Sequence, residues 1–144
     1  MSVDRVGDGE GQSGGRAWLL AGTPGYQAPE LLLGLNPAPP CDLYSLGVLL
    51  WQVDSREVPW AGHHPQAVMF RVVSTGARPV PPRPHMASIG LPSYTELYQS
   101  CWQAGPAKRP SAAEVAAALE RLLDQRQRRQ QQQQQQLRSR SLRC

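Results

Sequence analysis

The stretch that most constrains the fold of this 144-residue chain is the apolar run from Cys41 to Val53. Between Leu43 and Val53 only Ser45 and Gln52 are polar. A helix that is apolar on nearly all faces lies in the middle of a domain, with other elements packed around it. The run is shorter than the roughly 20 residues that a transmembrane helix needs. The sequence therefore predicts a central buried helix.

Two prolines directly before this run indicate where the helix begins. Pro39 and Pro40 cannot continue a helix from upstream, but proline is tolerated before the first turn. Asp42 follows at a point where a side-chain oxygen can cap free backbone N–H groups. We therefore expect the helix to start directly after Pro40, with Asp42 as its cap, and to end near Asp54.

Further helices are predicted on both sides of the central one. Pro29 and Pro65 suit the first position of a helix, and Gly34 and Gly76 stand where each of these two helices would end. No segment is convincing as a strand. The predicted fold class is therefore all-α, with five helices.

The last two helices have capping-box patterns at their expected starts. In such a box a serine and a glutamate three residues later satisfy each other's free backbone N–H groups. Ser93-Tyr-Thr-Glu96 and Ser111-Ala-Ala-Glu114 both have this spacing. Each box is expected to open a helix.

Composition divides the chain into three parts. The Gly-rich residues 1–16 are expected to be disordered, residues 17–124 form the body, and residues 125–144 are a Gln/Arg-rich tail. Glutamine is a fair helix former, so the last helix is expected to continue into the glutamine tract 130–136 without packing on anything. A tract without defined function is the simpler interpretation, and a protein-interaction or aggregation-prone role is the alternative.

Charge and cysteine usage limit the possible partners and compartments. The chain carries a net charge of +4, but the residues from Arg121 onward hold seven arginines and one aspartate, so the body is near neutral. Such a tail is typical of a solvated extension rather than a specific nucleic-acid or membrane site. Three widely spaced cysteines fit a reducing compartment, and no histidine stands at a metal-ligand spacing. With no signal peptide or membrane span in the sequence, we expect a soluble, cytoplasmic protein.

Four motifs follow one another along the body. They are Gly22-Thr-Pro-Gly-Tyr-Gln-Ala-Pro-Glu30, Asp42-Leu-Tyr-Ser-Leu-Gly47, Val58-Pro-Trp-Ala-Gly62, and Cys101-Trp102 through Lys108-Arg-Pro110. In this order, and at this approximate spacing, they resemble the C-terminal lobe of a eukaryotic protein kinase, from the end of the activation segment to the last helix. Each motif alone is a weak signal, but all four together make chance resemblance very unlikely. Thr23 points to the serine/threonine type, and the Cys-Trp pair is similar to the Mos-like and wider tyrosine-kinase-like branch.

The resemblance implies two sets of site residues, one that positions the substrate and one that holds the lobe together. The implied substrate-positioning loop is Gly22, Thr23, Pro24, Gly25 and Tyr26, and the implied structural residues are Ala28, Pro29, Glu30, Asp42, Gly47, Trp102 and Arg109. Glu30 and Arg109 are expected to form a buried ion pair, because a lone buried charge is costly. The alternative is that both side chains are simply exposed. For Asp42 the resemblance favours binding backbone N–H groups of a catalytic loop over a plain helix cap.

The groups that phosphoryl transfer needs are missing from the sequence. Family members use a Gly-rich loop, a strand lysine, a catalytic aspartate and a magnesium-binding aspartate in a DFG motif. The only phenylalanine, Phe70, follows Met69, and the only lysine is Lys108 within the last motif. No residue of this chain is therefore assigned a catalytic, cofactor-binding or metal-binding role. ATP and magnesium are expected only in a complete family member.

These observations lead to one expected function and one alternative. The chain is expected to be an incomplete large lobe, without the small lobe and catalytic loop, of a serine/threonine protein kinase that phosphorylates proteins with ATP. Such a fragment would be inactive alone. The alternative is a non-catalytic binding module or scaffold. The expected partners are protein substrates or regulators of a kinase, with self-association through exposed apolar surface.

Overall fold

A computed structural model of the chain describes residues 23–80 and 92–141. Over these ranges it contains α-helices and short 3-10 turns but no strand, so the predicted all-α class is confirmed there. The helices are α1 (Pro29–Leu32), α2 (Pro39–Ser55), α3 (Pro65–Ser74), α4 (Pro92–Cys101) and α5 (Ala112–Ser141), with 3-10 turns η2 (Pro24–Tyr26) and η3 (Pro106–Lys108). The predictions made for residues 1–16 lie outside the described residues.

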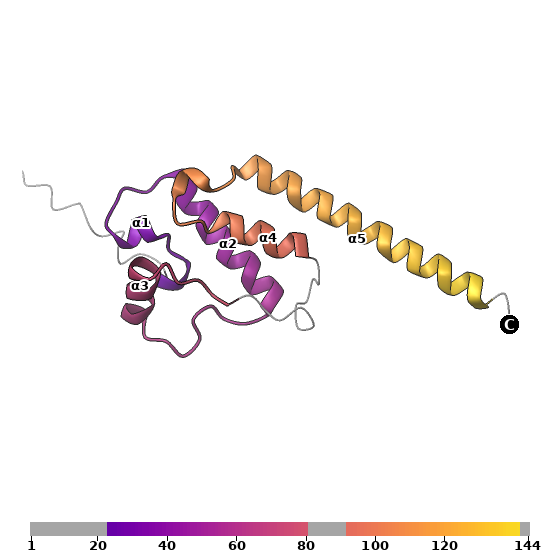
Figure 1. Cartoon of the computed structure of the whole chain (residues 1–144), viewed down its shortest axis with the longest axis horizontal. Coiled ribbons are helices and arrows are strands. Elements are labelled where there is room, and N and C mark those ends of the chain that lie inside the picture. Colours follow the sequence, from indigo (N-terminus) through magenta and orange to yellow (C-terminus); the bar gives the residue numbers. More distant parts are fainter. Residues whose placement is uncertain (1–22, 81–91, 142–144) are drawn as a thin grey trace, which may run out of the picture.

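Helix α2 is the central element of the body (Figure 1). Helix α4 packs along it, η2 and η3 contact it as well, and α3 packs against α1 and η2. The buried residues of α2 are Cys41, Leu43, Tyr44, Gly47, Val48, Trp51 and Asp54. The prediction of burial on every side is wrong for one face, where Leu49 and Val53 are 49% and 53% exposed. The described helices pack on the other faces of α2 and leave these two side chains uncovered.

Helix α2 begins at Pro39, close to the predicted start, but its cap differs from the prediction. The N-cap residue is Ala38, whose side chain makes no capping hydrogen bond. Asp42 lies inside the first turn and is exposed. A negative charge in the first turn is favoured by the helix macrodipole, so Asp42 suits its place without being the cap.

The two predicted capping boxes have different outcomes. Helix α4 already begins at Pro92, so Ser93 lies within its first turn and does not precede it, and that predicted box start is wrong. The second box is confirmed. The Ser111 N–H donates to Glu114 Oε2 at 2.8 Å, and the Glu114 N–H donates to Ser111 Oγ at 3.3 Å.

The contact between α2 and α4 is unusually close at Gly47. A Cβ atom added at Gly47 would lie 2.8 Å from the Cβ of Cys101 and 3.0 Å from the carbonyl oxygen of Tyr98. Beside this point the rings of Tyr98 and Trp102 meet edge to face, with centroids 5.1 Å apart. Both aromatic residues are buried and belong to the main core cluster. Gly47 thus lets two helix backbones approach closely enough for an aromatic core to form.

Helix α5 packs on the body only through its first turns. Val115 and Leu122 are buried, whereas every described side chain from Leu123 to Ser139 is exposed. The helix is about 45 Å long at 1.5 Å per residue, and its yellow end projects away from the body in Figure 1. The expectation that the helix continues unpacked through the glutamine tract is therefore confirmed. None of the described helices is long and apolar enough to span a membrane.

Replacing Gly47 by alanine is expected to destabilise the fold by about 1–3 kcal/mol, because the added methyl group overpacks the α2–α4 contact. The matched control is Gly105→Ala, since a Cβ atom there meets only the flexible side chain of Lys108, at 3.7 Å. Urea unfolding followed by circular dichroism measures both changes. Equal effects of the two substitutions would contradict the close approach.

Candidate functional site

The candidate site is built around an ion pair between Glu30 in α1 and Arg109 just after η3. Nη1 and Nη2 of Arg109 donate to Oε1 and Oε2 of Glu30, at 2.5 and 2.8 Å. The side chain of Arg109 is fully buried and that of Glu30 is 12% exposed. The predicted buried ion pair is therefore present, and its bidentate geometry is the stronger form of such a pair.

Every N–H group of the Arg109 guanidinium has an acceptor. Besides the two bonds to Glu30, Nη1 donates to the carbonyl oxygen of Pro40 at 2.8 Å, and Nη2 donates to that of Ala104 at 3.3 Å. Nε donates to the carbonyl oxygen of Gln103 at 2.8 Å. A guanidinium has five N–H donors, so none is left unsatisfied. One side chain thereby joins α1, the start of α2 and the segment after α4.

Two neighbours of the ion pair come from α2. The thiol of Cys41 donates to Glu30 Oε1 at 3.3 Å, and burial of Cys41 is the main reason that the pKa of this thiol is raised, which keeps it protonated as a donor. The guanidinium carbon of Arg109 lies 5.2 Å from the ring centroid of Tyr44. Tyr44 is 1% exposed, so this cation–π contact is shielded from water.

The carboxyl group of Glu30 titrates below its ordinary range. Burial alone raises its pKa, but the hydrogen bond from Arg109, a backbone hydrogen bond, the thiol of Cys41 and the charge of Arg109 lower it by more in sum. The pKa therefore lies below the ordinary value of 4.5. Glu30 is consequently a carboxylate, not a carboxylic acid, at neutral pH.

The predicted substrate-positioning loop is held on α2 by Ser45 and Gln52, two polar side chains within the apolar run of that helix. The hydroxyl of Tyr26 donates to Gln52 Oε1 at 2.6 Å, and the hydroxyl of Ser45 donates to the carbonyl oxygen of Tyr26 at 2.8 Å. Ser45 and Gln52 are the polar exceptions in the apolar run, and no role was predicted for them. Their polarity within that run was the available signal.

The other side of the loop rests on the connection between α2 and α3. A Cβ atom at Gly25 would lie 3.0 Å from Cδ1 of Trp60, so the indole packs directly against the backbone of the loop. A small pocket of about 90 Å³ opens here, lined by Thr23, Pro24, Gly25, Trp60 and His63 together with three further residues. Thr23 itself is exposed. The loop thus offers a short exposed edge above a fixed base.

The predicted site residues fall into separate groups in the structure. Glu30 and Arg109 are brought together, and Ala28 is fully buried beside them in the core. Gly47 and Trp102 lie at the contact of α2 with α4 and support the core rather than the loop. Gly22 is outside the described residues, as is His85. Asp42 is exposed, and its predicted bonds to a catalytic loop stay a prediction.

Within residues 23–80 and 92–141, no group of three or more histidine, cysteine, aspartate or glutamate side chains is placed to hold a metal ion. The single lysine of the sequence, Lys108, lies in η3 directly before the buried Arg109. That the chain binds no nucleotide stays a prediction.

Comparisons with known proteins match most of the chain. The family model for the protein kinase domain matches residues 9–119. The serine/threonine-protein kinase mos of Patiria pectinifera is 43% identical over 122 residues, which cover 83% of this chain and 33% of that protein. The proto-oncogene serine/threonine-protein kinase mos of Rattus norvegicus is 42% identical over 93 residues, or 65% of this chain and 27% of that protein. The chain thus spans about a third or less of the length of these relatives.

The ion pair makes a specific prediction about acid stability. Because the folded-state pKa of Glu30 is lowered, its contribution to stability is fully present above the unfolded-state value of 4.5 and is lost as the pH falls through the folded-state pKa. Glu30→Gln removes the titrating group but keeps the shape. The unfolding free energies of the wild type and Glu30→Gln should therefore differ most near neutral pH and converge under acid conditions.

The matched control is Glu96→Gln, the same chemical change at an exposed side chain. Its unfolding free energy should stay within about 0.5 kcal/mol of the wild type. Denaturant unfolding at a series of pH values measures all three chains. A gap for Glu30→Gln that does not change with pH would show that the carboxylate charge contributes nothing.

Proposed function

The chain belongs to the protein kinase family, with Mos-type serine/threonine kinases among its relatives, and from this we propose that it forms the substrate-positioning part of a kinase large lobe. In this role the loop from Gly22 to Tyr26 would hold the protein substrate beside its phosphoacceptor residue. The complete activity would be the transfer of a phosphoryl group from ATP to a serine or threonine of a protein. The partners would be protein substrates or regulators of such a kinase.

The observation that best supports this role is the way the loop is fixed to the body. Glu30, at the end of the motif that contains the loop, is bound by both guanidinium nitrogens of the buried Arg109. Tyr26, at the end of the loop, is bound through Ser45 and Gln52. A loop that is anchored at these points keeps its exposed edge in one place, and positioning of a reacting group is a large part of phosphoryl-transfer catalysis.

We propose that this chain does not carry out the transfer alone. The sequence contains no DFG motif and no lysine besides Lys108, so the groups that would pair with ATP phosphates and hold magnesium must come from outside it. The proposed organisation is a leading segment 1–16, a partial kinase domain 17–124 and a tail 125–144. Cys41 and Cys101 are buried and form no disulfide bond, which supports a reducing, cytoplasmic setting.

The alternative role, a non-catalytic binding module, is supported by two half-exposed apolar side chains on one face of α2. Leu49 and Val53 lie one turn apart on that face and are about half exposed. Apolar side chains that are grouped on one surface favour contact with another protein. Such a surface would bind either a second copy or another polypeptide.

A melting experiment on the purified 144-residue chain tests the proposal that it holds no nucleotide site of its own. Tm is measured with and without ATP and magnesium chloride, with a complete Mos-type kinase as positive control. A ligand that binds the chain, at 100 times its Kd, would stabilise it by about 2.7 kcal/mol and raise Tm by several degrees. Because we expect no binding, the Tm of this chain should shift by less than about 1 °C. Melting at two protein concentrations in the same experiment reports self-association, which raises Tm with concentration.

A saturable shift of Tm with ATP and magnesium would contradict the proposal that this chain lacks a nucleotide site. A Tm that rises with protein concentration would favour the binding-module role. A Tm independent of concentration would exclude a second copy as the cover of Leu49 and Val53.

A further inference from the structure

A second pocket, of about 320 Å³, shares Trp60 and His63 with the small pocket beside the predicted substrate loop. We call it the Trp60 pocket. Its walls are the connection between α2 and α3, one side of α3, and the segment that follows α3. The lining residues used below are Trp51, Glu57, Trp60, His63, Arg71 and Arg78. Its volume is at the lower end of the roughly 300–1,000 Å³ found for ligand pockets.

One wall of the pocket is built from strained backbone. Among the described residues, Arg56 and Trp60 are the non-glycine residues with positive φ, at 58° and 62°. Arg56 is the C-cap of α2, where left-handed backbone is common, so Trp60 is the one of the two that shapes the pocket lining. A bulky residue in the left-handed region is uncommon and unfavourable, and such conformations gather at functional sites. The connection therefore keeps the indole of Trp60 in a position that relaxed backbone would not give it.

The floor of the pocket is apolar and fixed. Trp51 is 4% exposed, and its indole N–H donates to the carbonyl oxygen of Val80 at 2.8 Å. This bond ties the segment after α3 to the central helix. Val58, Ala61 and Pro79 add further apolar surface to the lining. An apolar side chain entering here would meet two indole groups that do not need to rearrange.

The mouth of the pocket carries a cation without a carboxylate partner. Arg71 is exposed, and its Nη1 lies 2.9 Å from Nε2 of His63. Because a guanidinium only donates, Nε2 must accept, and the proton of the neutral imidazole is on Nδ1. Nδ1 lies 3.2 Å from the carbonyl oxygen of Ala61, which fits this tautomer. In the part of the chain that the structure describes, Arg71 makes no ion pair.

The other charged residues of the pocket leave it with a net positive charge. Arg78 also lines it, but its Nε donates to the carbonyl oxygen of Trp102 at 2.9 Å, and its guanidinium lies over the ring of Tyr44. Glu57 is the one carboxylate in the lining. Two guanidinium groups against one carboxylate favour an anion, and only Arg71 is exposed enough to bind it.

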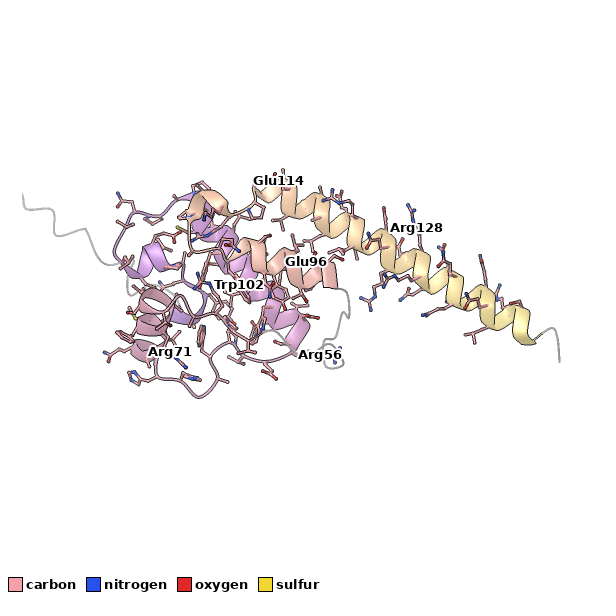
Figure 2. The ribbon with its side chains drawn as sticks, in the orientation of Figure 1. Arg56, Arg71, Glu96, Trp102, Glu114 and Arg128 are labelled. Carbon is pink, nitrogen blue, oxygen red and sulfur yellow. The ribbon has the colours of Figure 1, made fainter. Side chains whose placement is uncertain are left out.

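We propose that the Trp60 pocket binds an extended peptide in which an aromatic or branched aliphatic side chain is followed by an acidic residue. The apolar side chain would lie between Trp51 and Trp60, and the carboxylate would pair with Arg71. A bidentate pair of a guanidinium with a carboxylate is directional as well as strong. Figure 2 shows Arg71 at the surface of the body, on α3.

The position of the pocket favours a peptide over an isolated small molecule, an argument that rests on the proposed function. Trp60 and His63 line both the Trp60 pocket and the small pocket beside Thr23 and Gly25. A polypeptide held at the loop would therefore pass close to the Trp60 pocket. The pocket would then select partners through a segment away from the residue that is phosphorylated.

Nuclear magnetic resonance on the ¹⁵N-labelled 144-residue chain tests the proposal through the indole N–H signals. The probe is the blocked peptide N-acetyl-Leu-Phe-Asp amide, and the matched control peptide has Asn in place of Asp. The probe should shift the signals of Trp51 and Trp60 and leave that of Trp102 in place. The control peptide should bind about tenfold more weakly, because a hydrogen bond to a charged group is lost.

Two arginine variants separate the specific contact from general charge. Arg71→Gln should lower the affinity for the Asp peptide to that for the Asn peptide. Arg128→Gln should leave binding unchanged, because Arg128 is also an exposed cation but lies on the projecting half of α5 and not in the pocket lining (Figure 2). Equal binding of the two peptides, or equal effects of the two variants, would overturn the assigned role of Arg71. Absence of shifts at Trp51 and Trp60 at millimolar probe would overturn the pocket itself. This test uses no nucleotide, so its failure is distinct from failure of the proposed kinase role.

Discussion

The rest of this structure depends on the hydrogen bonds of the buried Arg109 guanidinium group. Burying a charged group costs free energy unless hydrogen-bond partners replace the water that it loses. Here the replacement is complete, because a carboxylate and three backbone carbonyl groups accept all five N–H bonds. Since the three carbonyls belong to Pro40, Gln103 and Ala104, the side chain also fixes the backbone at the start of α2 and after α4. The arrangement is therefore a structural joint as well as an ion pair.

The joint explains how a short helix and an irregular loop stay on a small helical body. Helix α1 has only four residues, none of them fully buried, and Leu31 is its partly buried apolar contact with the core, so apolar burial contributes little to holding it. Its attachment comes from Glu30, from the buried Ala28 just before it, and from the bonds of Tyr26 to α2. The exposed edge of the loop is thus positioned by contacts that lie beneath it.

Much of the fold could be predicted because its signals are local. Prolines at positions 29, 39 and 65 mark helix starts, and a capping box marks the start of α5. The wrong predictions concern what surrounds a helix. Asp42 has the right chemistry for a cap, but the prolines let the helix begin three residues earlier. Leu49 and Val53 are as apolar as their neighbours, and only the placement of the other helices leaves them uncovered.

The site was predicted where side-chain charge required a partner and was missed where backbone supplied the contact. Glu30 and Arg109 could be paired before the structure because the motifs that contain them resemble those of a kinase large lobe, and a buried charge needs an opposite partner. The carbonyl partners of Arg109 could not be found, since every residue has a carbonyl group and its direction depends on the fold. The Trp60 pocket was missed for a similar reason: it depends on the positive φ of Trp60, which is unusual for tryptophan.

The most direct test of the joint is a double-mutant cycle between Glu30 and Arg109, measured by urea unfolding at neutral pH. The cycle uses Glu30→Gln, Arg109→Met and the double variant. If the two side chains act as one unit, their coupling energy should be about 1.5–3 kcal/mol, the range for hydrogen bonds to charged groups. Effects that add to within about 0.5 kcal/mol would mean that the two residues act independently, and the central role given to Arg109 would be contradicted.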